Sequence, residues 1–140
     1  MRQLLGVIVA IVAIILLLCP RMAKASNDHL EIDQARCTAA YHAVDDDGIK
    51  TWCRAAAEEY DIQASLETGE IRFGSMLMEG IDLLDASVSE GILGQKSTAH
   101  YDALNARAIF RTIAIGSNNP KLREKAVAGL KSADAMIVDP

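Results

Sequence analysis

Apolar side chains recur every three or four positions from about residue 28 onward, and no stretch alternates in the manner of a β-strand. Short polar or glycine-containing breaks divide this pattern into five segments. They cover about residues 28–44, 49–60, 68–88, 97–115 and 120–137. The pattern therefore predicts an all-α protein, a small five-helix bundle of antiparallel helical hairpins.

The first two segments are separated by Asp45-Asp46-Asp47-Gly48, a composition typical of turns. We expect a tight turn here, with one aspartate capping the second helix. The stripe before the turn contains Leu30, Cys37, Tyr41 and Val44, and the stripe after it contains Ile49, Trp52, Cys53, Ala56 and Tyr60.

The third segment contains Gly74 and Gly80, which are predicted to permit close approach of a neighbouring helix. Gly91 and Gly94 indicate a loop after it. The apolar stripe of the third segment is Phe73, Leu77, Ile81, Leu84 and Val88.

Ser97 or Thr98 is the expected cap of the fourth helix. Apolar side chains occur on nearly every side of the fourth helix, which predicts a central position in the bundle. Gly116 is expected to end this helix, with Asn119 as the next cap and Pro120 at the first position of the fifth helix. The fifth stripe is Leu122, Ala126, Leu130, Ala133 and Ile137.

The N-terminal part of the chain has the features of a secretory signal peptide. A run of 16 residues, Leu4 to Cys19, is apolar apart from Gly6 and would span about 24 Å as a helix, short of a bilayer core of about 30 Å. Pro20 then breaks the helix, and Ala23-Lys24-Ala25 is a small-x-small cleavage pattern. We predict a signal peptide over residues 1–25, cut after Ala25, and one helical domain over 26–140. The alternative is an uncleaved membrane anchor, since the charges flanking the run are only weakly asymmetric.

Cleavage removes Cys19 and leaves Cys37 and Cys53, an even pair addressed to an oxidising compartment. The two cysteines lie at similar distances from the predicted turn, so facing helices would bring them to similar height. We therefore predict a disulfide between them that staples the first hairpin. It should contribute about 3 kcal/mol by closing a 15-residue loop. The expected location is periplasmic or secreted.

The formal net charge of −5 becomes −8 when Arg2, Arg21 and Lys24 leave with the signal. An acidic domain argues against nucleic acid as a partner, because binding it requires neutralising phosphates. Charge is uneven: residues 26–102 carry a net −11 and residues 103–140 a net +3. The basic side chains of the last helix are candidate partner-binding residues, or a solvated helix face: Lys121, Arg123, Lys125 and Lys131.

The sequence offers little chemistry of catalysis. It has no G-x-S-x-G nucleophile motif and no pair of histidines at metal-binding spacing. Asp45, Asp46 and Asp47 are weak candidates for a hard cation such as Ca²⁺, although position twelve of an EF-hand spacing would be Ala56 rather than glutamate. We therefore expect no enzymatic activity and no cofactor.

Trp52 and Tyr60 on an alanine-rich hairpin, with Leu93-Gly94 followed by Ala106 and Phe110, resemble part of the tetratricopeptide repeat pattern. The resemblance covers about a third of the mature chain, and Trp52 falls on the second helix of its hairpin rather than the first. It implies a groove that binds a peptide or protein and no catalysis.

These observations favour an exported, non-enzymatic helical protein that binds another protein or peptide, as an adaptor or an inhibitor in the envelope. One alternative is a periplasmic protein that binds a small ligand or a metal. Another is an accessory subunit of an envelope complex, which would contact the membrane through an uncleaved N-terminal segment.

Overall fold

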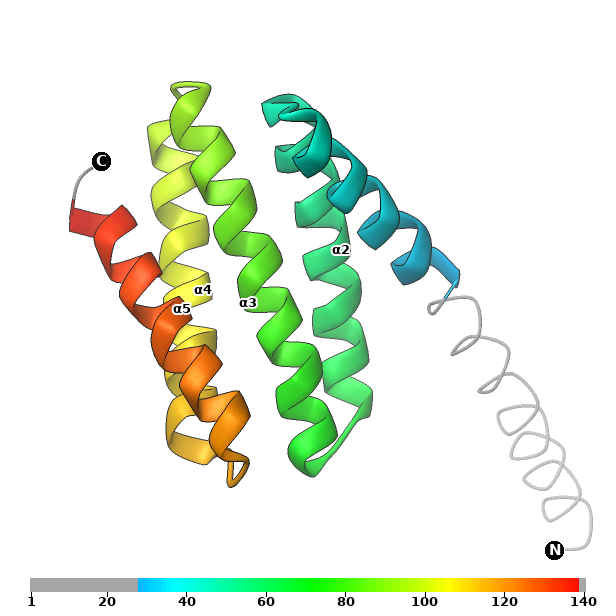
Figure 1. Cartoon of the computed structure of the whole chain (residues 1–140), viewed down its shortest axis with the longest axis vertical. Coiled ribbons are helices and arrows are strands. Elements are labelled where there is room, and N and C mark those ends of the chain that lie inside the picture. Colours follow the sequence, from blue (N-terminus) through cyan, green and yellow to red (C-terminus); the bar gives the residue numbers. More distant parts are fainter. Residues whose placement is uncertain (1–27, 139–140) are drawn as a thin grey trace, which may run out of the picture.

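The computed structural model describes residues 28–138, which form five helices joined by short connections (Figure 1). The helices are residues 28–43, α2 (Asp46–Leu66), α3 (Gly69–Ile92), α4 (Lys96–Gly116) and α5 (Pro120–Val138). Consecutive helices lie side by side, and the chain reverses direction at each connection (Figure 1). The prediction of an all-α fold with five helices is confirmed, and the described residues contain no strand.

The predicted signal segment, residues 1–25, lies outside the described residues. Among the helices of residues 28–138, none is long and apolar enough to cross a membrane.

The connection between the first helix and α2 is a tight turn. Val44 follows the helix with a positive φ of 53°, and the amide of Asp45 donates to the carbonyl of Ala40 at 3.0 Å. Asp45 is the N-cap residue of α2, and its Oδ1 accepts a hydrogen bond from the Gly48 amide at 3.1 Å. One aspartate of the acidic run therefore caps the second helix, as predicted.

The end of α3 was predicted too early. The helix continues past Val88 to Ile92, so Gly91 lies inside it instead of in a loop. Backbone hydrogen bonds extend the last turn, since the amide of Leu93 still donates to the carbonyl of Ser89 at 2.9 Å. The chain leaves the helix at Gly94, whose φ of 78° suits glycine.

The predicted cap of α4 is also wrong. The carbonyl of Gln95 accepts hydrogen bonds from the amides of Thr98 and Ala99, so the helix begins at Lys96 without a side-chain cap. Ser97 and Thr98 are therefore both inside the first turn.

The boundary between α4 and α5 matches the prediction. Gly116 is the last residue of α4, and Pro120 is the first of α5. The side chain of Asn119 accepts a hydrogen bond from the amide of Lys121 at 3.0 Å, which caps α5.

The central helix of the bundle is α3, which contacts α2, α4 and α5. The prediction that α4 is central is wrong: the backbones of α3 and α5 pack against it but that of α2 does not, and its Tyr101 and Ile115 are exposed. Two apolar clusters lie on opposite sides of α3. The one toward the first helix and α2 contains Cys37, Ala40, Ile49, Cys53 and Ala86, and the one toward α4 and α5 contains Leu77, Ala106, Phe110, Ile113 and Ala126.

Phe110 fills the second cluster from α4 and is fully buried. A Cβ atom at Gly80 of α3 would lie 2.8 Å from its ring, and one at Gly129 of α5 would lie 2.6 Å away. Gly80 thus permits the close helix approach that was predicted for it. Gly74 does not, because a Cβ there would meet nothing within 4 Å.

This packing predicts opposite effects for the same substitution at two helical glycines. Gly129→Ala should destabilise the protein by about 1–3 kcal/mol, because the buried ring of Phe110 has no room to move. Gly74→Ala should stabilise it by up to about 1 kcal/mol through helix propensity alone. Urea unfolding of the two variants checks both signs; equal effects would contradict the packing.

Candidate functional site

The predicted disulfide is present between Cys37 of the first helix and Cys53 of α2, with 4.7 Å between the Cα atoms. Both residues are buried. Trp52 packs against the apolar cluster that contains both cysteines, and the guanidinium of Arg36 lies 4.3 Å from the centroid of the Trp52 ring. A bonded cysteine pair points to an oxidising compartment.

Exposed apolar side chains gather around the C-terminal turn of α3. Val88 and Ile92 stand between two hollows of about 360 and 350 Å³ and line both of them. The first hollow extends to Tyr41 and Val44 of the first helix and its turn, and the second extends to Met136 of α5. We call this region the apolar end surface and define it by Tyr41, Val44, Val88, Ile92 and Met136.

Exposure distinguishes these side chains from the core. Val44 is 81% exposed, Ile92 67% and Tyr41 59%. Tyr41, Val44 and Val88 were predicted to lie on buried stripes, but the structure leaves all three exposed beside the first hollow. Apolar groups in this exposed arrangement are typical of surfaces that bind other proteins.

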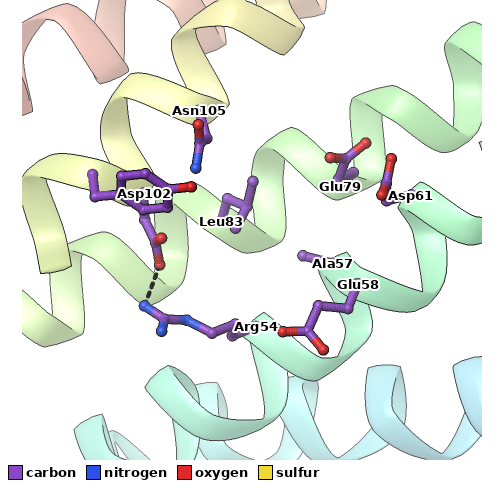
Figure 2. Close-up of a pocket in the computed structure, with 9 residues that line it drawn as sticks. Arg54, Ala57, Glu58, Asp61, Glu79, Leu83, Asp102 and Asn105 are labelled. Carbon is purple, nitrogen blue, oxygen red and sulfur yellow. Dashed lines mark hydrogen bonds and ion pairs between the residues drawn. The ribbon is translucent and has the colours of Figure 1, made fainter.

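A second candidate region is an acidic cavity of about 360 Å³ between α2, α3 and α4 (Figure 2). Figure 2 shows Glu79 of α3 close to Asp61 of α2, while Arg54 of α2 extends toward Asp102 of α4. Burial, together with the charge of Asp61, raises the pKa of Glu79 to about 7. This cavity therefore contains one carboxyl group, that of Glu79, whose pKa lies near neutral pH.

Arg54 is the cation at the inner end of this cavity. Its guanidinium donates to Asp102 Oδ2 at 2.5 Å and to Glu90 Oε1, and both carboxylates are buried. Burial still raises the pKa of Glu90 and of Asp102, although the ion pairs with Arg54 lower it. The three helices α2, α3 and α4 thus meet at one charged cluster.

This cluster was not predicted from the sequence, although a signal was present. Arg54 is the one basic residue between positions 51 and 71, and Asp102 is the one acidic residue between positions 97 and 115. A charged side chain requires a partner of opposite charge if it is buried. Which charge it meets depends on the packing of the helices.

The other predicted site residues lie apart from these regions. Asp47 of the acidic run pairs with Lys50 at 3.2 Å, while Asp45 caps α2. All four basic residues of α5 are exposed, and the charge of Arg123 helps to lower the pKa of Glu70. The other three basic residues of α5 are Lys121, Lys125 and Lys131.

Comparisons with protein families, with curated proteins and with solved structures find no match to this chain. The resemblance to tetratricopeptide repeats stays a prediction.

The charged cluster predicts a large effect for removing its cation. Arg54→Met should destabilise the protein by about 3 kcal/mol at pH 7, because Glu90 and Asp102 would remain buried without a counter-charge. Arg107→Met is the matched control: its partner Asp134 is half exposed, so the loss should stay below about 1 kcal/mol.

The loss of stability in Arg54→Met should depend on pH in a defined direction. Because the pKa values of Glu90 and Asp102 are raised in the folded state, that state holds their protons more tightly than the unfolded state. Stability is then highest at low pH and falls as pH rises past the unfolded-state pKa values. The deficit of Arg54→Met should therefore shrink between pH 7 and pH 5 in urea unfolding; a constant deficit would argue against buried carboxylates as its cause.

Proposed function

We propose that this chain is an exported, non-enzymatic protein that binds an apolar helical segment of another protein on its apolar end surface. The observation that carries the proposal is the pair of hollows on either side of Val88 and Ile92. A helix laid across the surface would place one apolar side chain in each hollow, a mode of peptide recognition that uses side chains about one or two turns apart.

Val44 gives the proposal independent support. It is β-branched, 81% exposed and held at a φ of 53°, where glycine is the favoured residue. A side chain in this conformation costs about 1–2 kcal/mol. Because Val44 gains no burial in return, a contact with a partner is a physical reason for its presence at this position.

Charges at the rim indicate the chemistry of the partner. Asp46 and Asp85 line the first hollow, whereas Lys96 and His100 line the second. A complementary segment has an apolar centre, a basic residue at the end that meets the two aspartates, and an acidic residue at the other end. This arrangement fixes the direction of the bound helix.

Export is supported by the sequence of residues 1–25 and by the disulfide. Leu4 to Cys19 supplies the apolar region of a signal peptide, and the predicted cut after Ala25 leaves a periplasmic or secreted domain of antiparallel hairpins. The bonded Cys37–Cys53 pair fits the same oxidising location.

The basic residues of α5 remain a second proposed contact. Lys121 and Lys125 share one side of the helix, because four residues advance the direction of a side chain by about 400°. Arg123 lies about 200° from Lys121, on the side that faces Glu70. A basic patch for an acidic partner therefore centres on the two lysines.

Strain at Val44 predicts a conflict between stability and binding. Val44→Gly should stabilise the free protein by about 1 kcal/mol, because glycine adopts the positive φ without a steric cost. Val44→Ala keeps a Cβ atom and should show no such gain. Thermal unfolding separates the two variants; a glycine variant no more stable than the alanine variant would remove the argument from strain.

Site-specific photo-crosslinking in the native envelope tests the binding surface. A benzoylphenylalanine at Ile92 should give an adduct of defined mass, and one at Val127, which is also exposed on α5, should not. Val44→Glu should abolish the Ile92 adduct by placing a charge in the first hollow. Adducts of equal yield at both positions, or an adduct that persists in Val44→Glu, would contradict the proposal.

A further inference from the structure

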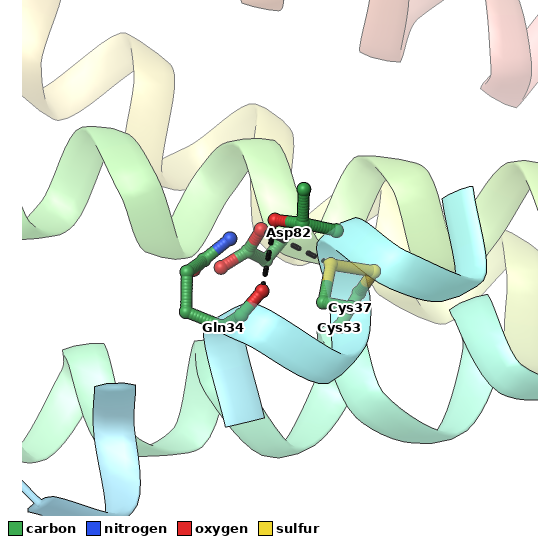
Figure 3. The surroundings of a disulfide bond; sticks show 5 residues. Gln34, Cys37, Cys53 and Asp82 are labelled. Carbon is green, nitrogen blue, oxygen red and sulfur yellow. Dashed lines mark hydrogen bonds between the residues drawn. A yellow bond between two sulfur atoms is a disulfide. The ribbon is translucent and has the colours of Figure 1, made fainter. Parts of the chain in front are cut away.

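A small chamber of about 180 Å³ lies between the first helix and α3, next to the disulfide. Figure 3 shows the carboxylate of Asp82 between the side chain of Gln34 and the bonded sulfur atoms of Cys37 and Cys53. Asp85, one helical turn further along α3, also lines the chamber. Oxygen-bearing side chains from two helices therefore line one part of this open hollow, and the rest of its lining, which includes Met78 and Ile81, is apolar.

The hydrogen bonding of this group is incomplete. Asp82 is 2% exposed, and the side chain of Gln34 supplies a hydrogen bond to its carboxylate. Its Oδ2 nevertheless has no donor, and neither does Oε1 of Gln34. Asp82 Oδ1 lies 3.8 Å from Sγ of Cys37, but a disulfide sulfur carries no hydrogen to donate. Buried oxygens of this kind are costly unless a donor or a cation meets them.

The charge of the chamber is also uncompensated. No Lys, Arg or His is among the described residues that line it, so two aspartates face each other's charge without a cation. Elsewhere in the bundle, buried carboxylates have a cation from the chain itself, because Arg54 pairs with Glu90 and Asp102. When Asp82 is ionised, none of the side chains that line the chamber can therefore supply its counter-charge.

We propose that a hard divalent cation of the Ca²⁺ class binds in this chamber, ligated by the carboxylates of Asp82 and Asp85 and by the amide oxygen of Gln34. An all-oxygen set of carboxylate and amide ligands is what Ca²⁺ prefers. The volume leaves space for several waters, each of about 30 Å³, to complete the coordination. Soft metals are disfavoured because both sulfur atoms are held in the disulfide.

This site differs from the cation site that the sequence suggested. Asp45 and Asp47 are engaged as a helix cap and in an ion pair with Lys50, whereas Asp82 and Gln34 have unused oxygens. The orphaned oxygens of Asp82 and Gln34 are separate from the partner-binding surface, but Asp85 lines both the chamber and the first hollow, so a bound ion would compete with the partner for its carboxylate.

Calorimetric titration of the purified, oxidised protein with CaCl₂ after removal of metals tests the site. The wild type should bind one Ca²⁺ per chain and melt at higher temperature in its presence. Asp82→Asn should weaken binding at least tenfold, and the exposed Asp47→Asn should leave it unchanged. Asn is isosteric with Asp and removes a buried charge, so circular dichroism should show that the Asp82 variant is folded.

Three outcomes would overturn the assignment. No heat and no melting shift in the wild type at millimolar Ca²⁺ would show that a proton or water satisfies Asp82. Equal binding by Asp82→Asn would place the ion elsewhere. Loss of binding in Asp47→Asn alone would return the site to the turn before α2.

Discussion

The ion pairs of Arg54 set the constraint that the rest of the bundle satisfies. Glu90 and Asp102 are both buried on α3 and α4, and the guanidinium from α2 compensates the charge of both carboxylates. Small residues lie next to these ion pairs. Ala57 lines the same cavity as Arg54 and Asp102, and Ala103, next to Asp102 in the sequence, is fully buried.

The two sides of α3 are held by different means. Toward α4 and α5, Phe110 and its aliphatic neighbours provide a conventional apolar cluster, closed by the glycines of the adjacent helices. Toward the first helix, the buried apolar residues are few and mostly small, and the disulfide supplies part of the constraint. The first helix therefore depends more on covalent and polar contacts than α5 does.

Sequence periodicity was sufficient for the helices and for the cysteine pair, because both depend on local spacing. Asn119 and Pro120 identified the start of α5, and the aspartate run identified the turn before α2, since caps act within a few residues. Tertiary relations were not accessible in the same way. The apolar faces of α4 look alike in sequence, and only packing decides that Phe110 is buried while Ile115 is exposed.

The candidate sites illustrate the same limit. Asp82 comes directly after Ile81, which lies on the predicted apolar stripe of α3. The sequence around Asp82 is that of an ordinary solvent-facing acid. Its burial follows from the first helix, which crosses that side of α3 because the disulfide ties it to α2. Tyr41 and Val44 show the reverse, since both lie on a predicted apolar stripe and are nevertheless exposed. A buried acid and an exposed valine both depart from what their local pattern predicts, and such departures are expected where a protein meets a ligand or a partner.

The raised pKa values of the buried acids make the stability of the fold respond to pH in one direction. Burial is the largest cause at Glu79 and Asp82, whose pKa values both rise to about 7, and at Asp85, whose pKa rises as well. In each case the folded state favours the protonated group, so these residues oppose folding more strongly as pH rises toward 7. A bound cation would act in the opposite sense at Asp82, because it favours the ionised carboxylate. Protons and cations are thus alternative ways to satisfy the same buried oxygens, and the pH of the compartment decides which of them the chain requires.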